Sequence, residues 1–262
     1  MALWYKAWLE TRFRFLVSAT LITGCSAFFV LGNPFILGTW REWQQLHPQE
    51  IEQPWILRAA DDYPYFIWHF VFRLLLQQLW VLCVVLISLG GLARESAQGS
   101  AGFTLSLPVS RRRLVSARAA VGLLEIAVLG LIPALVIPAL SVLIGKPYPV
   151  TQGIAHALLM ILGGTVFFGL GIFLSTVIQS EHTPALIGVA FVALLYFILT
   201  PYLDEGTAAP LWVQMIDVSR VMAGAPYLTT LATYPLWGVS MSLLVAALLF
   251  YLSLKITDER DY

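Results

Sequence analysis

The residues with the most specific pattern are 104–113, which read TLSLPVSRRR. A Leu-Ser-Leu unit ends in Pro108, and three arginines follow after Val109 and Ser110. Residues of these types supply binding rather than bond breaking. The segment lies in a short loop between two long apolar stretches, so it is typical of a docking element on a membrane protein and not of an active site.

Composition places the whole chain in a lipid bilayer. Hydrophobic residues make up 59% of the 262 residues and charged residues 11%. An ordinary soluble domain has about 25% charged residues. We therefore expect the elements on either side of the docking segment to be transmembrane helices.

Six apolar stretches are long enough to span a membrane. About 20 apolar residues in a helix cross roughly 30 Å of hydrocarbon. The predicted spans are residues 15–32, 65–92, 114–144, 153–178, 184–203 and 236–254. The second and third are longer than needed, and Pro133 and Pro138 are expected to kink the third because proline lacks a backbone donor.

The distribution of basic residues predicts the orientation. Six spans leave both termini on one side, and that side holds most of the lysines and arginines, whereas Arg41, Arg58, Lys146 and Arg220 lie on the other. By the positive-inside rule, both termini are expected in the cytoplasm.

The N-terminal residues predict an interfacial amphipathic helix. Lys6, Glu10 and Arg14 recur at i, i+4 and i+8, and Trp4 and Trp8 belong to a broad aromatic face. Such a helix is expected to lie along the cytoplasmic leaflet before the chain turns into span one. The alternative is that these residues are simply the charged start of span one.

A second amphipathic segment, residues 204–234, precedes the last span. Trp212, Met215 and Met222 share one face, and Pro226 interrupts the apolar stretch that follows. We expect two short helices that rest on the outer leaflet or dip into it; an ordinary ordered surface loop is the alternative. The predicted fold is thus an all-α polytopic membrane protein with six transmembrane helices, forming a single domain over residues 1–262.

Motifs for catalysis are missing from the sequence. No G-x-x-x-x-G-K-[ST] phosphate-binding loop occurs, so we do not expect the chain itself to hydrolyse ATP. The four histidines are scattered, with no cysteine or carboxylate at ligand spacing, and no metal site is expected. Cys25 and Cys83 fall inside predicted spans and are expected to be packed thiols. We predict no enzyme activity and no cofactor in this chain.

Three polar residues inside the predicted spans are candidate functional residues. Glu125 is the one acid in its apolar run, where a charge costs roughly 2.5 kcal/mol or more unless it is paired or hydrated. It either lines a functional cavity or is bonded to a neighbouring helix near the inner interface. Arg73 and Gln77, at i and i+4 on span two, either face a cleft or lie near the outer headgroups.

Small residues on span four predict close helix packing. Thr165 and Gly169, and also Gly171 and Ser175, are four residues apart. Small side chains allow helix backbones to approach closely in lipid. The partner helix could belong to the same subunit or to a second copy.

The loop after span two resembles that of a known family. Residues 91–95 (GLARE), Gly99, 104–113 and 114–118 (LVSAR) resemble the same loop of ABC-2 type permeases, the membrane subunits of type V ABC transporters. The interfacial helix, the six spans, the broken outer segment and the charged residues 255–262 agree with this resemblance. It implies an exporter subunit in the cytoplasmic membrane of a prokaryote.

The resemblance also implies a mechanism and partners. In such transporters the loop forms a coupling helix that inserts into a groove on a separate ATPase subunit, which binds ATP and Mg. The implied docking residues are Glu95, Gln98, Leu105, Leu107, Pro108 and Arg111. Glu181 and His182 would form a smaller second contact. The arginines could equally serve membrane anchoring.

A complete transporter of this kind contains two nucleotide-binding ATPase subunits and a second permease, identical or related. Its cavity would be lined by spans one, two and five at the permease interface. Two other classes remain open on the residues alone. A secondary transporter would be self-sufficient, and a membrane-embedded enzyme or scaffold would not transport.

Overall fold

The computed structural model describes residues 2–47, 54–89, 109–178, 180, 183–199, 210 and 217–259. Every regular element in these residues is a helix, which confirms the all-α prediction for them. The helices are, in chain order, α1 (Ala2–Leu31), α2 (Asn33–Leu46), α3 (Pro54–Asp61), α4 (Tyr63–Phe66), the π-helix η1 (Ile67–Leu75), α5 (Leu76–Ser88), α8 (Arg111–Leu143), α9 (Val150–Val177), α10 (Thr183–Leu199), α12 (Val218–Ala223), the 3-10 helix η3 (Leu231–Thr233) and α13 (Leu236–Glu259).

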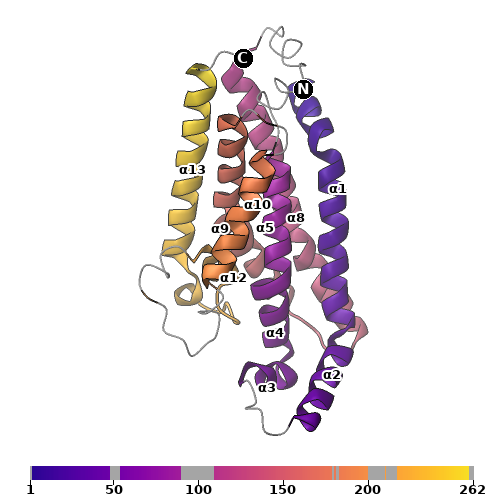
Figure 1. The fold of residues 1–262 in the computed structure, drawn as a ribbon. Helices are drawn as coiled ribbons and strands as arrows, with labels where there is room; N and C mark the ends of the chain where they lie inside the picture. The colour runs from indigo at the N-terminus through magenta and orange to yellow at the C-terminus, as the bar shows by residue number, and fades with distance from the viewer. Residues whose placement is uncertain are drawn as a thin grey trace.

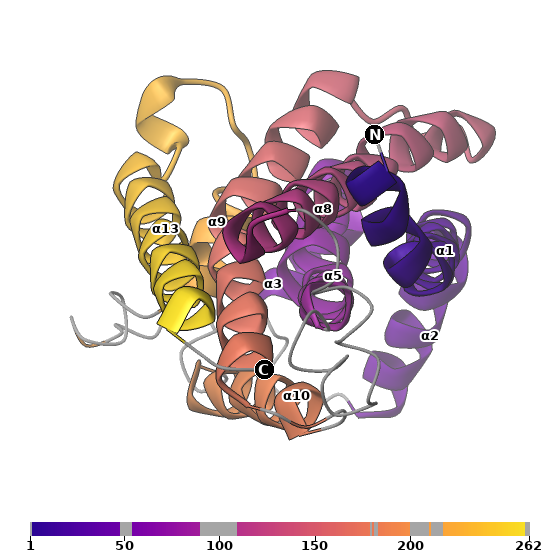
Figure 2. The same ribbon diagram turned by 90° about the horizontal axis from the view of Figure 1, so that it is seen from above.

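The long helices lie side by side in one bundle. The start of α1 and the end of α13 lie at the same end of it, as predicted for the termini (Figure 1). Seen from above, α5 is central, with α1, α8, α9 and α10 around it, while α13 packs on the outer side of α9 (Figure 2). This arrangement brings helices that are distant in sequence against the end of α5.

Five helical runs are long and apolar enough to cross a membrane: α1, the continuous run Tyr63–Ser88, α8, α9 and α13. They coincide with five of the six predicted spans. The predicted fifth span corresponds to α10, of which 17 residues are described. The protein is therefore a multi-pass membrane protein, and the count of six remains a prediction.

The structure corrects the prediction for the N-terminal residues. α1 is one uninterrupted helix, so the expected turn between an interfacial helix and span one is absent, in agreement with the alternative that these residues are the charged start of span one. Glu10 and Arg14 of the polar stripe bond to α8 and to the end of α5. A polar stripe on a helix can pair with polar groups of other helices as well as with water, and here it does the former.

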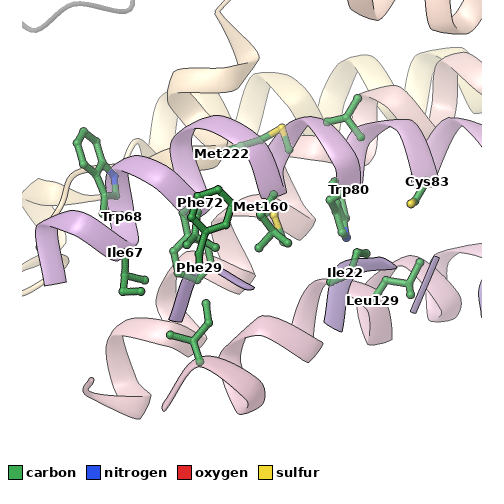
Figure 3. Packing of buried hydrophobic residues seen from close by; sticks show 14 of the residues in the cluster. Ile22, Phe29, Ile67, Trp68, Phe72, Trp80, Cys83, Leu129, Met160 and Met222 are labelled. Atoms are coloured by element: carbon green, nitrogen blue, oxygen red, sulfur yellow. The ribbon is translucent and has the colours of Figure 1, made fainter. Parts of the chain in front are cut away.

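The core lies between α5, α8 and α9. Trp80, Phe72, Met160 and Leu129 are fully or almost fully buried, as is Ile22 of α1 (Figure 3). Pro133 and Pro138 lie inside α8 without ending it. This core connects α1, α8 and α9 to the central α5.

The small residues of span four make close contacts within the subunit. A Cβ atom on Gly169 would lie 3.1 Å from Cα and O of Ala246 in α13. Gly171 faces Ser88 of α5. The close-packing face predicted from the sequence thus serves two neighbouring helices of the same chain.

Replacing Gly169 by valine is expected to destabilise the α9–α13 contact. Backbone atoms of Ala246 cannot move aside as a flexible side chain can, so the overpacking should cost about 1–3 kcal/mol. Thermal unfolding in detergent should show a lower midpoint. Gly24→Val is the matched control, because no atom lies within 4 Å of a Cβ at Gly24. Equal midpoints for the two variants would contradict the prediction.

The described part of the segment before the last span packs into the bundle. α12 contacts α9 and η1, and Met222 is 1% exposed beside Gly163 and Gly164 near the middle of α9. A short helix was predicted here, either resting on the outer leaflet or dipping into it. The packing of Met222 against the small residues near the middle of α9 agrees with a helix that dips inward.

Candidate functional site

Most residues of the predicted docking surface fall outside the described part of the chain. These are Glu95, Gln98, Leu105, Leu107 and Pro108, together with Glu181 and His182 of the smaller contact. Arg111 is described and is the first residue of α8, partly buried. The structure therefore shows the two ends from which residues 90–108 extend, namely Leu89 after α5 and Val109 before α8.

The start of α8 is stabilised by a capping serine. The Ser110 hydroxyl accepts a hydrogen bond from the backbone N–H of Arg113 at 3.4 Å, as an N-cap residue does. Three arginines in a first helical turn are unfavourable for the helix dipole. Arg112 offsets this by pairing with Asp258 near the end of α13. The predicted run of arginines thus also joins α8 to α13.

The end of α5 is held by two arginines from other helices. Arg14 Nη1 of α1 donates to the carbonyl oxygens of Leu86 at 3.0 Å and Leu89 at 2.7 Å. Arg118 Nη2 of α8 donates to the same Leu89 oxygen. The last carbonyls of a helix need donors from elsewhere, and a cation at that end also favours the dipole. The two guanidinium groups supply both.

Two carboxylates balance these arginines. Glu10 Oε2 accepts from Arg118 Nη1 at 2.8 Å. Glu125, only 4% exposed, interacts electrostatically with Arg118 and Arg14. We call Glu10, Arg14, Arg118 and Glu125 the charge quartet. Its formal charge is zero, which reduces the cost of placing four ionisable groups among apolar helices.

The surroundings of Glu125 agree with the second of its two predicted roles. Its Oε1 accepts a hydrogen bond from Thr11 Oγ1 of α1 at 2.5 Å, so the carboxylate is bonded to a neighbouring helix. Its Oε2 has no hydrogen-bond partner in the described part of the chain. Glu125 therefore links α8 to α1, and its functional role stays a prediction.

Arg73 and Gln77 lie away from the charge quartet, against α12. Gln77 is 1% exposed, and its Nε2 donates to the carbonyl oxygen of Ser219 at 2.8 Å. The guanidinium carbon of Arg73 lies 5.1 Å from the centre of the Trp68 ring. Gln77 thus bonds to α12, and Arg73 lies over the ring of Trp68. Whether the two residues face a cleft or lie near the outer headgroups stays a prediction.

Sequence reasoning missed the other side chains that hold α12. Trp68 Nε1 donates to the Ala223 oxygen at 3.2 Å, and His156 Nδ1 lies 3.1 Å from that oxygen. The sequence contained a usable signal for the charge quartet, since Arg118 and Glu125 are seven residues apart on one face of a helix. No sequence signal relates Trp68 or His156 to Ala223.

A bundle of long apolar helices that are joined by ion pairs such as Arg118–Glu10 defines a polytopic α-helical membrane protein. A family model described as ABC-2 family transporter protein matches residues 41–217. The chain belongs to this family, which confirms the resemblance seen in the sequence. It is the membrane subunit of an ABC transporter and works with ATP-binding subunits. No curated protein and no solved structure matches the chain.

Proposed function

We propose that the chain is the permease of an ABC exporter and that a separate ATPase subunit drives it through residues 90–113, which we call the docking segment. The observation that carries the proposal is the position of the two ends of this segment. The end of α5 and the start of α8 lie at the bundle end that also holds the start of α1 and the end of α13 (Figure 1). The basic residues of the sequence put that end in the cytoplasm.

The proposed topology has six crossings. Both terminal helices reach the same end of the bundle, so the number of crossings is even. The five candidate spans together with α10 make six. The excess of lysine and arginine around the termini supports a cytoplasmic location for both, in the cytoplasmic membrane of a prokaryote.

The proposed assembly is a pair of permeases with two ATPase subunits. Six spans form half of a translocation unit in such transporters, so a second permease, identical or related, completes it. The cavity then lies between the permeases and is lined by spans one, two and five. ATP and Mg are bound by the ATPase subunits, and this chain performs no catalysis itself. Glu181 and His182 form the smaller docking contact.

A reconstitution experiment tests the proposal. The full chain, purified from native membranes in mild detergent, is expected to carry an ATP-binding subunit with it. In liposomes the complex should hydrolyse ATP in a vanadate-sensitive manner, and faster than the isolated subunit. We expect the faster rate because the ATPase subunits close on ATP more readily when they are bound to the permease. A chain that carries no ATP-binding subunit would favour a secondary transporter or a scaffold instead.

A further inference from the structure

The end of α5 is bonded to two helices that are remote from it in sequence. Arg14 is 72 residues from Leu86 and 75 from Leu89, and Arg118 is 29 residues from Leu89. We propose that Arg14 and Arg118 are positioning residues that make α1 and α8 move together with the start of the docking segment. This inference rests on the proposed function and adds the elements that transmit the movement.

The geometry makes the two arginines suited to this role. The docking segment begins directly after Leu89, whose backbone is extended rather than helical. The Leu89 oxygen is the last acceptor described at this end of α5, and both guanidinium groups donate to it. A guanidinium can donate to several acceptors at once in a fixed planar geometry, which a lysine ammonium cannot reproduce. A displacement of Leu89 would therefore be transmitted through these hydrogen bonds to both arginines.

Further side-chain bonds between α1 and α8 determine which helices move with the two arginines. Arg118 is held by Glu10 of α1, and Glu125 of α8 is held by Thr11 of α1. α1 and α8 pack along each other over much of their length. A movement at the end of α5 would therefore displace α1 and α8 together. Without the arginines, the end of α5 would lose these bonds to α1 and α8.

Two variants that keep the charge test the inference. Arg14→Lys and Arg118→Lys preserve the neutrality of the charge quartet but lose the multiple donation to carbonyls. Both variants should still bind the ATPase subunit, because neither residue belongs to the docking segment. Permease-stimulated ATP hydrolysis in liposomes should fall by about 5-fold or more, the size of a typical coupling between sites. Arg12→Lys, an exposed arginine on the same helix, is the control and should hydrolyse ATP at the native rate.

A distance measurement on the chain alone provides the second readout. Spin labels on Tyr5→Cys in α1 and Leu86→Cys in α5, both exposed, report whether the two helices are held together; Cys25 and Cys83 are replaced by alanine. The distance distribution should be broader in both lysine variants than in the labelled parent or in the Arg12→Lys control. A role in stability only would lower the unfolding midpoint without broadening the distribution.

The outcomes separate this inference from the proposed function. Native ATP hydrolysis in either lysine variant overturns the inference, whatever the distances are. Unbroadened distributions in both variants overturn it as well. If the native chain neither binds nor stimulates an ATPase subunit, the proposed function fails. The label distances then still decide whether Arg14 and Arg118 hold α5 to its neighbours.

Discussion

Leu107→Asp is expected to abolish stimulation of ATP hydrolysis by this chain in the reconstituted complex. The proposed groove on the ATPase subunit is apolar, and a buried leucine contributes about 1.5–3 kcal/mol relative to an exposed one. Introducing a carboxylate adds the cost of burying an unpaired charge. Together these costs exceed 3 kcal/mol, or more than about 100-fold in affinity. Co-purification of the ATPase subunit should be lost with the activity.

The matched control for Leu107→Asp is Ser106→Asp. It introduces the same charge one residue earlier, where the side chain of a helix or an extended segment points in a different direction. We expect Ser106→Asp to retain most of the stimulation. Arg111→Glu should weaken the contact less than Leu107→Asp, because charges at the rim of an interface mainly affect association rates. Native co-purification of the ATPase subunit with Leu107→Asp would contradict the docking role of residues 104–113.

Trp80→Ala is expected to cause the largest loss of stability in the described core. The Trp80 side chain is fully buried and faces Gly164 of α9 and Gly130 of α8, so it fills the space between three helices (Figure 3). Truncation of a buried tryptophan to alanine costs about 3–5 kcal/mol, because the surrounding helices close the cavity only in part. Thermal unfolding in detergent should show a much lower midpoint, or the variant should fail to accumulate.

Trp237→Ala is the control for Trp80→Ala. Trp237 is the second residue of α13 and is 80% exposed, so the same truncation removes few contacts. Its unfolding midpoint should stay close to that of the native chain. Trp80→Phe should fall between the two, since it retains an aromatic ring. A similar midpoint for Trp80→Ala and Trp237→Ala would show that the α5–α8–α9 contact does not limit stability.

The positions of the spans were predictable because hydrophobic length is a property of a continuous stretch. The predicted span 153–178 coincides with α9 (Val150–Val177), and the predicted 236–254 begins where α13 begins. The close-packing face around Gly169 was predictable because the spacing of small residues is also a local property of the sequence. Its partner was not, since small residues on one helix do not indicate which helix approaches them.

The errors came from polar residues on apolar helices. Lys6, Glu10 and Arg14 were assigned to a helix at the membrane surface, because a helical wheel shows only that they share a face. The helical spacing of these residues is the same whether the face contacts water, lipid headgroups or another helix. The surroundings of Gln77 were left open for the same reason, and the π-helix η1 before it changes which residues align with Arg73.

The residue types and their local order were enough to establish a multi-pass helical membrane protein of the ABC-2 family and to propose a docking segment after its second span. They could do so because membrane insertion depends on apolar length and the family motif is a short continuous stretch. The folded chain was needed to reveal that Arg14 and Arg118 bind the end of α5 and that Glu125 pairs with α1. A buried charge takes whichever partner packing brings within a few ångströms, and such partners lie far away along the chain.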